Sequence, residues 1–326
     1  MRADVLQLVR SHGDDTLSFF KLRDDIEHLF SADHRAMLGY AEAMGVLLVA
    51  GDPVGPAAAL PGLIEETRAL ARRQGLRLAF LGASAVMRPV LERHGLRCLY
   101  IGDEAIVETE QFSLEGPAMR KLRKPNLRLE REGHRAEVLR LADADVSELE
   151  EVSARALGGV PERSFAWAMH TLRGEHLEDT VVVVGRDPDG AARGFLHLVP
   201  SFGRPAWSVS MMRRDPEAPN GLMDVLVLAA IGAARERGVE ELSLNFAAFS
   251  RWLREPVDRW ERLGGRLVRH GSRWIQMESL LRFNRKFTPR WDPRYLGYEG
   301  RLGFLRAGIA SARIEGQFAK LTSSAN

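Results

Sequence analysis

Charged side chains cluster at 213–224, where an alternating segment gives way to an apolar stretch that we predict to be a helix. The junction reads "RRDPEAPNG", and Asp224 follows inside the helix. Backbone amides at a helix N-terminus favour anions, and guanidinium groups suit phosphate. Arg213 and Arg214 point to opposite sides of a regular strand, whereas Asn220 and Asp224 can share one helix face. We therefore predict an anion site here, with an N-cap and helix-dipole pair as the alternative.

A second cluster has helical spacing. Glu278, Arg282 and Lys286 are four residues apart in a helix that we predict at 273–287. This spacing aligns an acid and two bases on one face, either in an active site or in a solvated salt-bridge ladder. Only five of the 46 Lys and Arg residues are lysines, and Lys286 is the only lysine between residues 125 and 319. A lysine retained in so arginine-rich a chain favours the functional interpretation.

The segment 116–133, which we also predict to be helical, is strongly basic. Pro125 lies inside it and is expected to kink the helix. Such a surface can bind tRNA or anionic lipid headgroups, and a solvated connecting helix balanced by nearby glutamates is the alternative. Its cations are Arg120, Lys121, Arg123, Lys124, Arg128 and Arg131.

Other chemistries lack their sequence patterns. The nine histidines show no metal-ligand spacing, and the sequence contains neither a G-x-S-x-G motif nor a P-loop. The single cysteine, Cys98, excludes internal disulfides and fits a reducing compartment. Asn245 ends an apolar stretch and is expected either to reach a cleft or to form a turn. We predict no metal and no cofactor.

Composition predicts a soluble globular protein. The 326 residues are 45% apolar and 28% charged, and the net charge is +2. Apolar runs such as 44–51 and 180–185 are far too short to span a bilayer, and charges interrupt the N-terminal stretch where a signal peptide is apolar. We expect a cytoplasmic protein that is long enough for two domains.

The elements that must position these residues repeat an order in the two halves of the chain: hairpin, strand, long helix, strand, helix, strand. This repetition predicts a duplicated mixed α/β fold, with domains at 1–115 and 136–326 joined by a basic helix within 116–135. In the first half we predict two strands within 36–55, a helix at 58–75, a strand at 76–83, a helix at 84–95 and a strand at 96–108 that breaks at Gly102. In the second half we predict a helix at 143–159, a hairpin at 180–200, a strand at 206–214, a helix at 220–238, a strand at 239–249 and helices at 254–265 and 273–287.

The order of the second half is that of the N-acetyltransferase (GNAT) fold. In that fold a central strand feeds a helix whose N-terminal amides bind the pyrophosphate of acetyl-CoA through a glycine-rich turn. The corresponding turn here, 213–221, has one glycine, two prolines and two acids. Prolines remove N–H donors and acids repel phosphate. The turn therefore predicts a GNAT-like scaffold that has lost CoA binding.

At this turn, and over nearly the whole chain, the sequence resembles the C-terminal catalytic domain of bacterial lysyl- and alanyl-phosphatidylglycerol synthases. The resemblance implies two tandem GNAT-like domains, each a mixed central sheet flanked by helices. It also implies transfer of an aminoacyl group from aminoacyl-tRNA to a hydroxyl of a polar lipid, usually phosphatidylglycerol. The matching blocks include "FFKLRDD", "VAGDPVGP", "YIGDEAIVE", "SVSMMRRDPEAPNGLMD", "LSLNFA" and "QMESLLRFNRKFTPRWDPRYL".

The resemblance, together with the local patterns, selects a set of site residues. Arg213 is expected to clamp a phosphate or the developing oxyanion, and the cations and aromatic groups of the last block are expected to contact phosphate and the tRNA 3′ end. The expected catalytic residues are Ser210, Arg213, Asp224, Glu278 and Lys286. The expected substrate-binding residues are Asn220, Asn245, Arg282, Arg290, Arg294 and Tyr295.

Two departures from the family accompany the resemblance. The family shows Ser-x-Asp-x-Met-Arg where this chain has "SVSMMR" at 208–213, so Ser210 replaces a carboxylate. The base is then Asp224, Glu278 or the terminal ribose hydroxyl of tRNA, or the chain is less active, and Ser210 shares a site with Arg213 only if the strand carries a bulge or turn onset. Full-length members also carry a membrane region that this sequence lacks, so we expect peripheral, electrostatic contact with anionic phospholipid.

Two other functions stay open on sequence alone. One is a CoA-dependent N-acyltransferase, as in other proteins of the GNAT fold. The other is a catalytically degenerate module that binds lipid or tRNA, which Ser210 motivates. The sequence predicts neither the amino acid transferred nor an oligomeric state.

Overall fold

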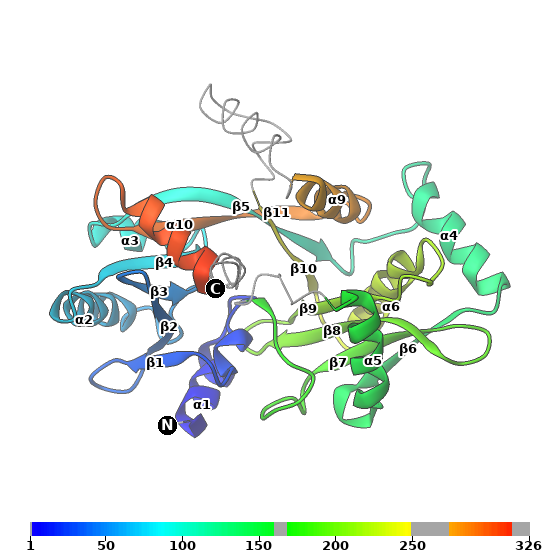
Figure 1. Cartoon of the computed structure of the whole chain (residues 1–326), viewed down its shortest axis with the longest axis horizontal. Coiled ribbons are helices and arrows are strands. Elements are labelled where there is room, and N and C mark those ends of the chain that lie inside the picture. Colours follow the sequence, from blue (N-terminus) through cyan, green and yellow to red (C-terminus); the bar gives the residue numbers. More distant parts are fainter. Residues whose placement is uncertain (1, 160–167, 249–273, 315–326) are drawn as a thin grey trace, which may run out of the picture.

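The computed structural model describes residues 2–159, 168–248 and 274–314. Within these ranges, eleven strands form one mixed sheet in the order β1-β2-β3-β4-β11-β5-β10-β9-β8-β7-β6 (Figure 1). This arrangement confirms the predicted mixed α/β class. The strands are β1 (Glu27–Phe30), β2 (Met37–Ala43), β3 (Val46–Ala50), β4 (Arg77–Ala83), β5 (Arg97–Glu108), β6 (Arg135–Arg140), β7 (Val181–Arg186), β8 (Ala192–Ser201), β9 (Ala206–Arg214), β10 (Glu241–Ala248) and β11 (Arg290–Tyr298).

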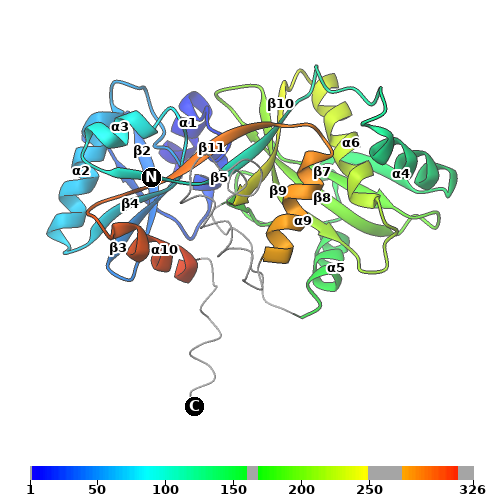
Figure 2. The same ribbon diagram turned by 90° about the horizontal axis from the view of Figure 1, so that it is seen from above.

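Helices flank the sheet on both faces. In the second half, α5 and α6 lie on opposite sides of the strands (Figure 2). The α-helices are α1 (Arg2–His12), α2 (Leu60–Arg73), α3 (Arg88–Arg93), α4 (Arg120–Arg131), α5 (Val146–Leu157), α6 (Leu222–Glu236), α9 (Trp274–Arg285) and α10 (Gly303–Ile314), and a 3₁₀ turn spans Phe19–Leu22.

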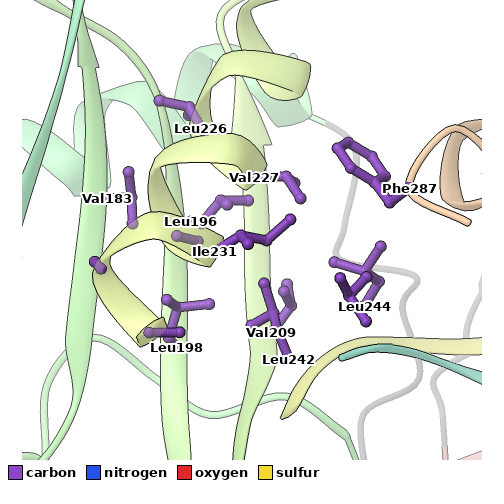
Figure 3. Packing of buried hydrophobic residues seen from close by; sticks show 14 of the residues in the cluster. Val183, Leu196, Leu198, Val209, Leu226, Val227, Ile231, Leu242, Leu244 and Phe287 are labelled. Carbon is purple, nitrogen blue, oxygen red and sulfur yellow. The ribbon is translucent and has the colours of Figure 1, made fainter. Parts of the chain in front are cut away.

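Both halves contain a parallel strand–helix–strand unit. In the first half β3 pairs with β4 in parallel, and α2 buries Leu63, Ile64 and Ala71 against the sheet. In the second half β9 pairs with β10 in parallel, and α6, which connects them, packs mainly on the neighbouring strands β6, β7 and β8. Apolar residues at helical spacing, such as Val227 and Ile231, place the buried face of α6 on the sheet (Figure 3). The element order predicted from periodicity is confirmed for both units.

The two halves exchange strands. β11 comes from the end of the chain, yet it lies between β4 and β5. β5 in turn pairs with β10 of the second half, so it lies between β11 and β10. α10 then contacts β2, β3 and β4, as both ribbon views show (Figures 1 and 2). Residues 290–314 therefore complete the sheet of the first half, and the boundaries 1–115, 116–135 and 136–326 stay a prediction.

Instead of the predicted break at Gly102, β5 continues as one strand from Arg97 to Glu108, with a register shift against β11 next to this glycine. The glycine serves a close approach instead. A Cβ at Gly102 would lie 2.5 Å from the carbonyl oxygen of Ala247 and equally close to the Phe246 ring. The strand therefore passes this point only without a side chain. The helix predicted at 254–265 lies outside the described residues.

Candidate functional site

An open hollow of about 1110 Å³ lies between α4, the start of α6 and the end of α9. Its lining carries seven cations and, as its one carboxylate, Asp224. So many cations in one concave surface produce a positive potential that attracts polyanions. The hollow brings together the predicted basic helix, the predicted anion-binding turn and the predicted helix at 273–287. The cations are Arg120, Lys121, Lys124, Arg128, Arg282, Arg285 and Lys286.

Asp224 and Lys286 form an ion pair inside this hollow. The Nζ of Lys286 donates to both carboxylate oxygens of Asp224, at 2.8 and 2.9 Å. Asp224 is buried in the first turn of α6, where the helix dipole also favours a negative charge. The same Nζ lies 5.2 Å from the centre of the Phe283 ring. Two predicted catalytic residues, 62 positions apart, are thus held together at the edge of the hollow.

Helix α4 braces the turn that precedes α6. The Nη2 of Arg128 donates to the carbonyl oxygen of Asn220 at 2.6 Å, and Nη1 of Arg214 donates to its side-chain oxygen at 3.2 Å. Gly221 has a φ of +95° and lies against Pro125, so a Cβ there would come within 2.6 Å of the Pro125 Cβ. The backbone at the helix N-terminus therefore faces α4 rather than open solvent.

Other members of the predicted set lie around the hollow or outside it. Glu278 pairs with Arg282 at 2.9 Å on an exposed helix face, as the salt-bridge alternative predicted. Arg123 donates to the carbonyl oxygens of Leu114 and Gly116. It therefore anchors the start of α4 to the preceding segment. Of the other cations of the predicted basic segment, all but Arg131 line the hollow.

A β-bulge interrupts β9 at Ser210. Its neighbours Val209 and Met211 face consecutive residues of β8, so Ser210 is the extra residue. The bulge places Ser210, Met211 and Arg213 on the face that α5 covers, where Nε of Arg213 donates to the Ser153 hydroxyl at 3.1 Å. This is the bulge that Ser210 and Arg213 need if they are to share a site.

The predicted catalytic residues consequently form two groups. Ser210 and Arg213 lie on the α5 face of the sheet, whereas Asp224 and Lys286 lie on the α6 face. The expected opposition of Arg213 and Arg214 is also present, because Arg214 points to Asn220 on the α6 side. The structure does not bring all five predicted catalytic residues into one cluster, and their roles stay predictions.

A buried polar layer continues from Ser210 along the α5 face. The Ser210 hydroxyl accepts a hydrogen bond from the His170 amide at 2.8 Å. The Asn245 side chain donates to the carbonyl oxygens of Ala168 and Val209, at 3.1 and 3.0 Å. Asn245 has a φ of +69°, the left-handed region that asparagine tolerates. It straps β9 to β10 where the two strands diverge, and its predicted role in a cleft stays a prediction.

Arg294 is the centre of this layer. Its side chain is buried, and its three nitrogens donate to Glu104, Thr16, Asp15 and the carbonyl oxygen of Gly82. Burial disfavours the charged guanidinium, yet the charges of Asp15 and Glu104 outweigh it and raise the pKa of Arg294 well above its usual value. Burial likewise opposes ionisation of Asp15, but Arg294 holds its pKa below the usual value. Arg294 therefore clamps β11 to β5 and to the N-terminal segment.

Arg290 and Tyr295 lie outside both groups. Arg290 forms surface ion pairs with Glu108, Glu241 and Asp292, at 2.6 to 2.9 Å. Tyr295 is buried, and the Arg88 guanidinium lies 5.1 Å from the centre of its ring. The predicted substrate contacts of both residues stay predictions.

Several residues that the sequence did not single out belong to these regions. Arg285 lines the hollow three positions after Arg282, so helical spacing could have found it. His197 had no such signal. It is fully buried on β8, and burial, followed by the proximity of His170, lowers its pKa to about 3. Glu104 lay in a matched block but was not selected, although it holds Arg294 and accepts a hydrogen bond from Ser243.

The described residues contain no group of three or more His, Cys, Asp or Glu side chains that could hold a metal ion. Among the described helices, none combines the length and apolarity needed to cross a bilayer.

Comparison with known proteins gives a consistent result. Residues 6–298 match the family described as phosphatidylglycerol lysyltransferase, C-terminal. Lysylphosphatidylglycerol biosynthesis bifunctional proteins of Rhodococcus jostii and Nocardia farcinica are each 36% identical over 95% and 96% of this chain, which spans 28% of their length. The structure of L-PGS from Bacillus licheniformis superposes with a TM-score of 0.85 and 25% identity, covering 97% of this chain and 96% of that one. The chain belongs to the phosphatidylglycerol lysyltransferase C-terminal family.

Proposed function

We propose that this domain transfers an aminoacyl group from aminoacyl-tRNA to a hydroxyl of phosphatidylglycerol. The observation that carries the proposal is the family match over residues 6–298. The names of the relatives refer to lysylphosphatidylglycerol, so lysine is the first amino acid to test.

The basic hollow supports a tRNA donor. Seven cations from α4 and the α9 end face one concave surface, and arginine and lysine bind nucleic-acid phosphates by charge and hydrogen bonding. Asp224 neutralises one of these cations, Lys286, and the other six keep the lining positive. We assign the hollow to the phosphates of the tRNA acceptor end.

The reaction requires little from the protein beyond positioning and electrostatics. The lipid hydroxyl oxygen attacks the ester carbonyl carbon, the bond to the ribose oxygen breaks, and the hydroxyl proton passes to that ribose oxygen. A cation near the carbonyl stabilises the oxyanion that forms on the way. Arg213, which shares a face with Ser210, is our candidate for that cation. A serine at position 210 cannot act as the base that removes the proton from the lipid hydroxyl. The terminal ribose hydroxyl of the tRNA can relay this proton instead.

The geometry disfavours a CoA-dependent N-acyltransferase. The turn that would hold pyrophosphate presents Gly221 to Pro125, and the carbonyl oxygen of Asn220 accepts from Arg128. An acidic side chain, Asp224, occupies the first helical turn. Neither feature favours a diphosphate at the α6 N-terminus.

The test is a transfer assay with purified chain, tRNA charged with radiolabelled lysine, and phosphatidylglycerol. We expect label in the lipid fraction, and we expect ribonuclease treatment before lipid addition to abolish it. Label that survives ribonuclease and depends on an acyl-CoA would replace the proposal with the N-acyltransferase. If charged tRNA binds but no lysyl or alanyl label moves, the chain is a binding module.

A further inference from the structure

An apolar ridge is exposed along helix α10. Six large hydrophobic side chains are exposed among the described residues, and three of them belong to this helix and the residue before it. Leu302 is 67% exposed, Leu305 is 52% exposed and Ile309 is 46% exposed. Scattered single hydrophobic residues are normal on a surface, whereas three on one helix call for an explanation.

Helical geometry places the three side chains together. Leu302, Leu305 and Ile309 are three and four residues apart, so they form one stripe along the helix. Ala307 and Ala310 are buried on the opposite side, within the core above β2 and β3. The small buried alanines hold α10 close to the sheet, and the large apolar side chains point away from the fold.

The charged residues within 300–314 have a single sign. Arg301, Arg306 and Arg313 border the ridge, and the stretch 300–314 contains no Asp or Glu. Arginine side chains can lay their stems along an apolar surface while their guanidinium groups reach phosphate. An apolar stripe bordered by cations is typical of helices that lie in the interface of an anionic bilayer.

We propose that α10 rests flat on an anionic membrane surface, with Leu302, Leu305 and Ile309 among the acyl chains and the arginines on lipid phosphates. The ridge and its charges carry the surface assignment, and the choice of a membrane as partner rests on the proposed lipid acceptor.

The position of α10 keeps this surface apart from the basic hollow. Figures 1 and 2 both place α10 and α4 towards opposite ends of the molecule. A protein attached through α10 therefore leaves the cations of α4 available to a second polyanion. This separation assigns the membrane to α10 and leaves the α4 hollow to tRNA.

The decisive experiment is vesicle flotation with the full chain. The vesicles contain equal parts of phosphatidylglycerol and phosphatidylcholine. The test variant replaces Leu302, Leu305 and Ile309 with serine, and we expect its partition into vesicles to fall about tenfold or more, because apolar burial drives interfacial binding. The matched control replaces Met44, Val86 and Leu127, the other three exposed large hydrophobic residues, with serine. It should bind like the unmodified chain, and both variants should keep its thermal midpoint.

Three outcomes would overturn the inference. Equal binding by the test variant is one. A second is equal loss in the control variant. The third is a dimer in solution that the test variant abolishes, because α10 would then contact a second copy. In a separate assay, water-soluble short-chain phosphatidylglycerol needs no membrane, so the test variant should transfer to it normally. Vesicle binding through α10 without any transfer would refute the proposed function and leave the inference intact.

Discussion

The two strand–helix–strand units share an order but differ at the point where their parallel strands meet. β3 and β4 pair over five positions, from Val46 to Ala50. β9 and β10 pair over only three, from Glu241 to Ser243, whereas the pairing of β10 with β5 on its other side continues to Ala248. The first unit is sealed by apolar residues of β3, all of them buried. The second carries serines and an asparagine where the strands diverge.

The N-termini of α2 and α6 also differ in polarity, and again the second unit is the more polar one. α2 follows the N-cap residue Ala59, begins with Leu60 and Pro61, and has no acid in its first turn. α6 begins beside Asn220 and Gly221, carries the ion-paired Asp224, and faces seven cations. One topology can therefore carry either a sealed apolar layer or a polar, charged surface, depending on which side chains lie where its parallel strands diverge.

The largest effect is expected where the two halves are joined. Arg294→Met leaves Asp15 and Glu104 buried without their cation, so we expect a loss of about 3–5 kcal/mol in the free energy of unfolding. Urea denaturation measures it. Arg290→Met, on the same strand, removes only surface ion pairs and should change stability by less than about 1 kcal/mol. Similar losses in the two variants would contradict the buried clamp.

The second prediction tests whether aminoacyl transfer takes place where β9 and β10 diverge. Arg213→Ala should lower lysyl transfer by about 10²-fold with the fold intact, because a cation at a developing oxyanion is worth a few kcal/mol. Arg214→Ala, on the other face, should reduce transfer only a few-fold. Initial rates and circular dichroism give the answer, and the reverse ranking would move the chemistry to the α6 face.

A third prediction concerns the burial of His197. Its pKa of about 3 lies below the unfolded value of roughly 6.5, so the unfolded chain binds more protons between these values. Stability is therefore complete above about pH 6.5 and falls as the pH drops, by about 2 kcal/mol from this group at pH 5. His197→Gln should flatten that part of the profile. The free energy of unfolding is measured at pH 7.5 and at pH 5 for both proteins. An equal loss between the two pH values in both proteins would rule out this burial effect.

The fourth prediction concerns the serine at the bulge. If phosphatidylglycerol is the acceptor, Ser210→Asp should keep transfer or raise it by up to about tenfold, because a carboxylate near an arginine stays ionised and can take a proton. The bulge provides the shared face that this needs. Ser210→Asn is the uncharged control. An inactive but folded aspartate variant would indicate a different acceptor or proton route.

The smallest effect is expected at the rim of the hollow. Arg282 is exposed and paired with Glu278, so Arg282→Ala should change the unfolding free energy by less than about 0.5 kcal/mol. It should still weaken tRNA binding a few-fold at low salt, since it removes one phosphate contact. Filter binding at two salt concentrations tests this, and an unchanged affinity at low salt would exclude Arg282 from the tRNA surface.

Most element types, their repeated order, the basic helix and the family can be predicted from the amino-acid sequence without the structure. These features follow from periodicity and local spacing. Alternating residues predict strands such as β9, residues at helical spacing predict α6, and neighbouring cations on one predicted helix mark α4. The hollow could be anticipated in part, because most of its cations lie in two short segments.

Which distant segments lie next to each other cannot be predicted in this way and follows from the folded structure. Nothing local shows that β11 inserts between β4 and β5, that Lys286 reaches Asp224, or that Arg294 finds Asp15 and Glu104. The sequence indicates that Ser210 and Arg213 can share a site only if the strand has a bulge. Whether the bulge is present depends on the register of β9 with β8. Strand pairing and buried ion pairs join residues far apart in the chain, and their energies depend on the burial and register of the whole sheet, which no local pattern contains.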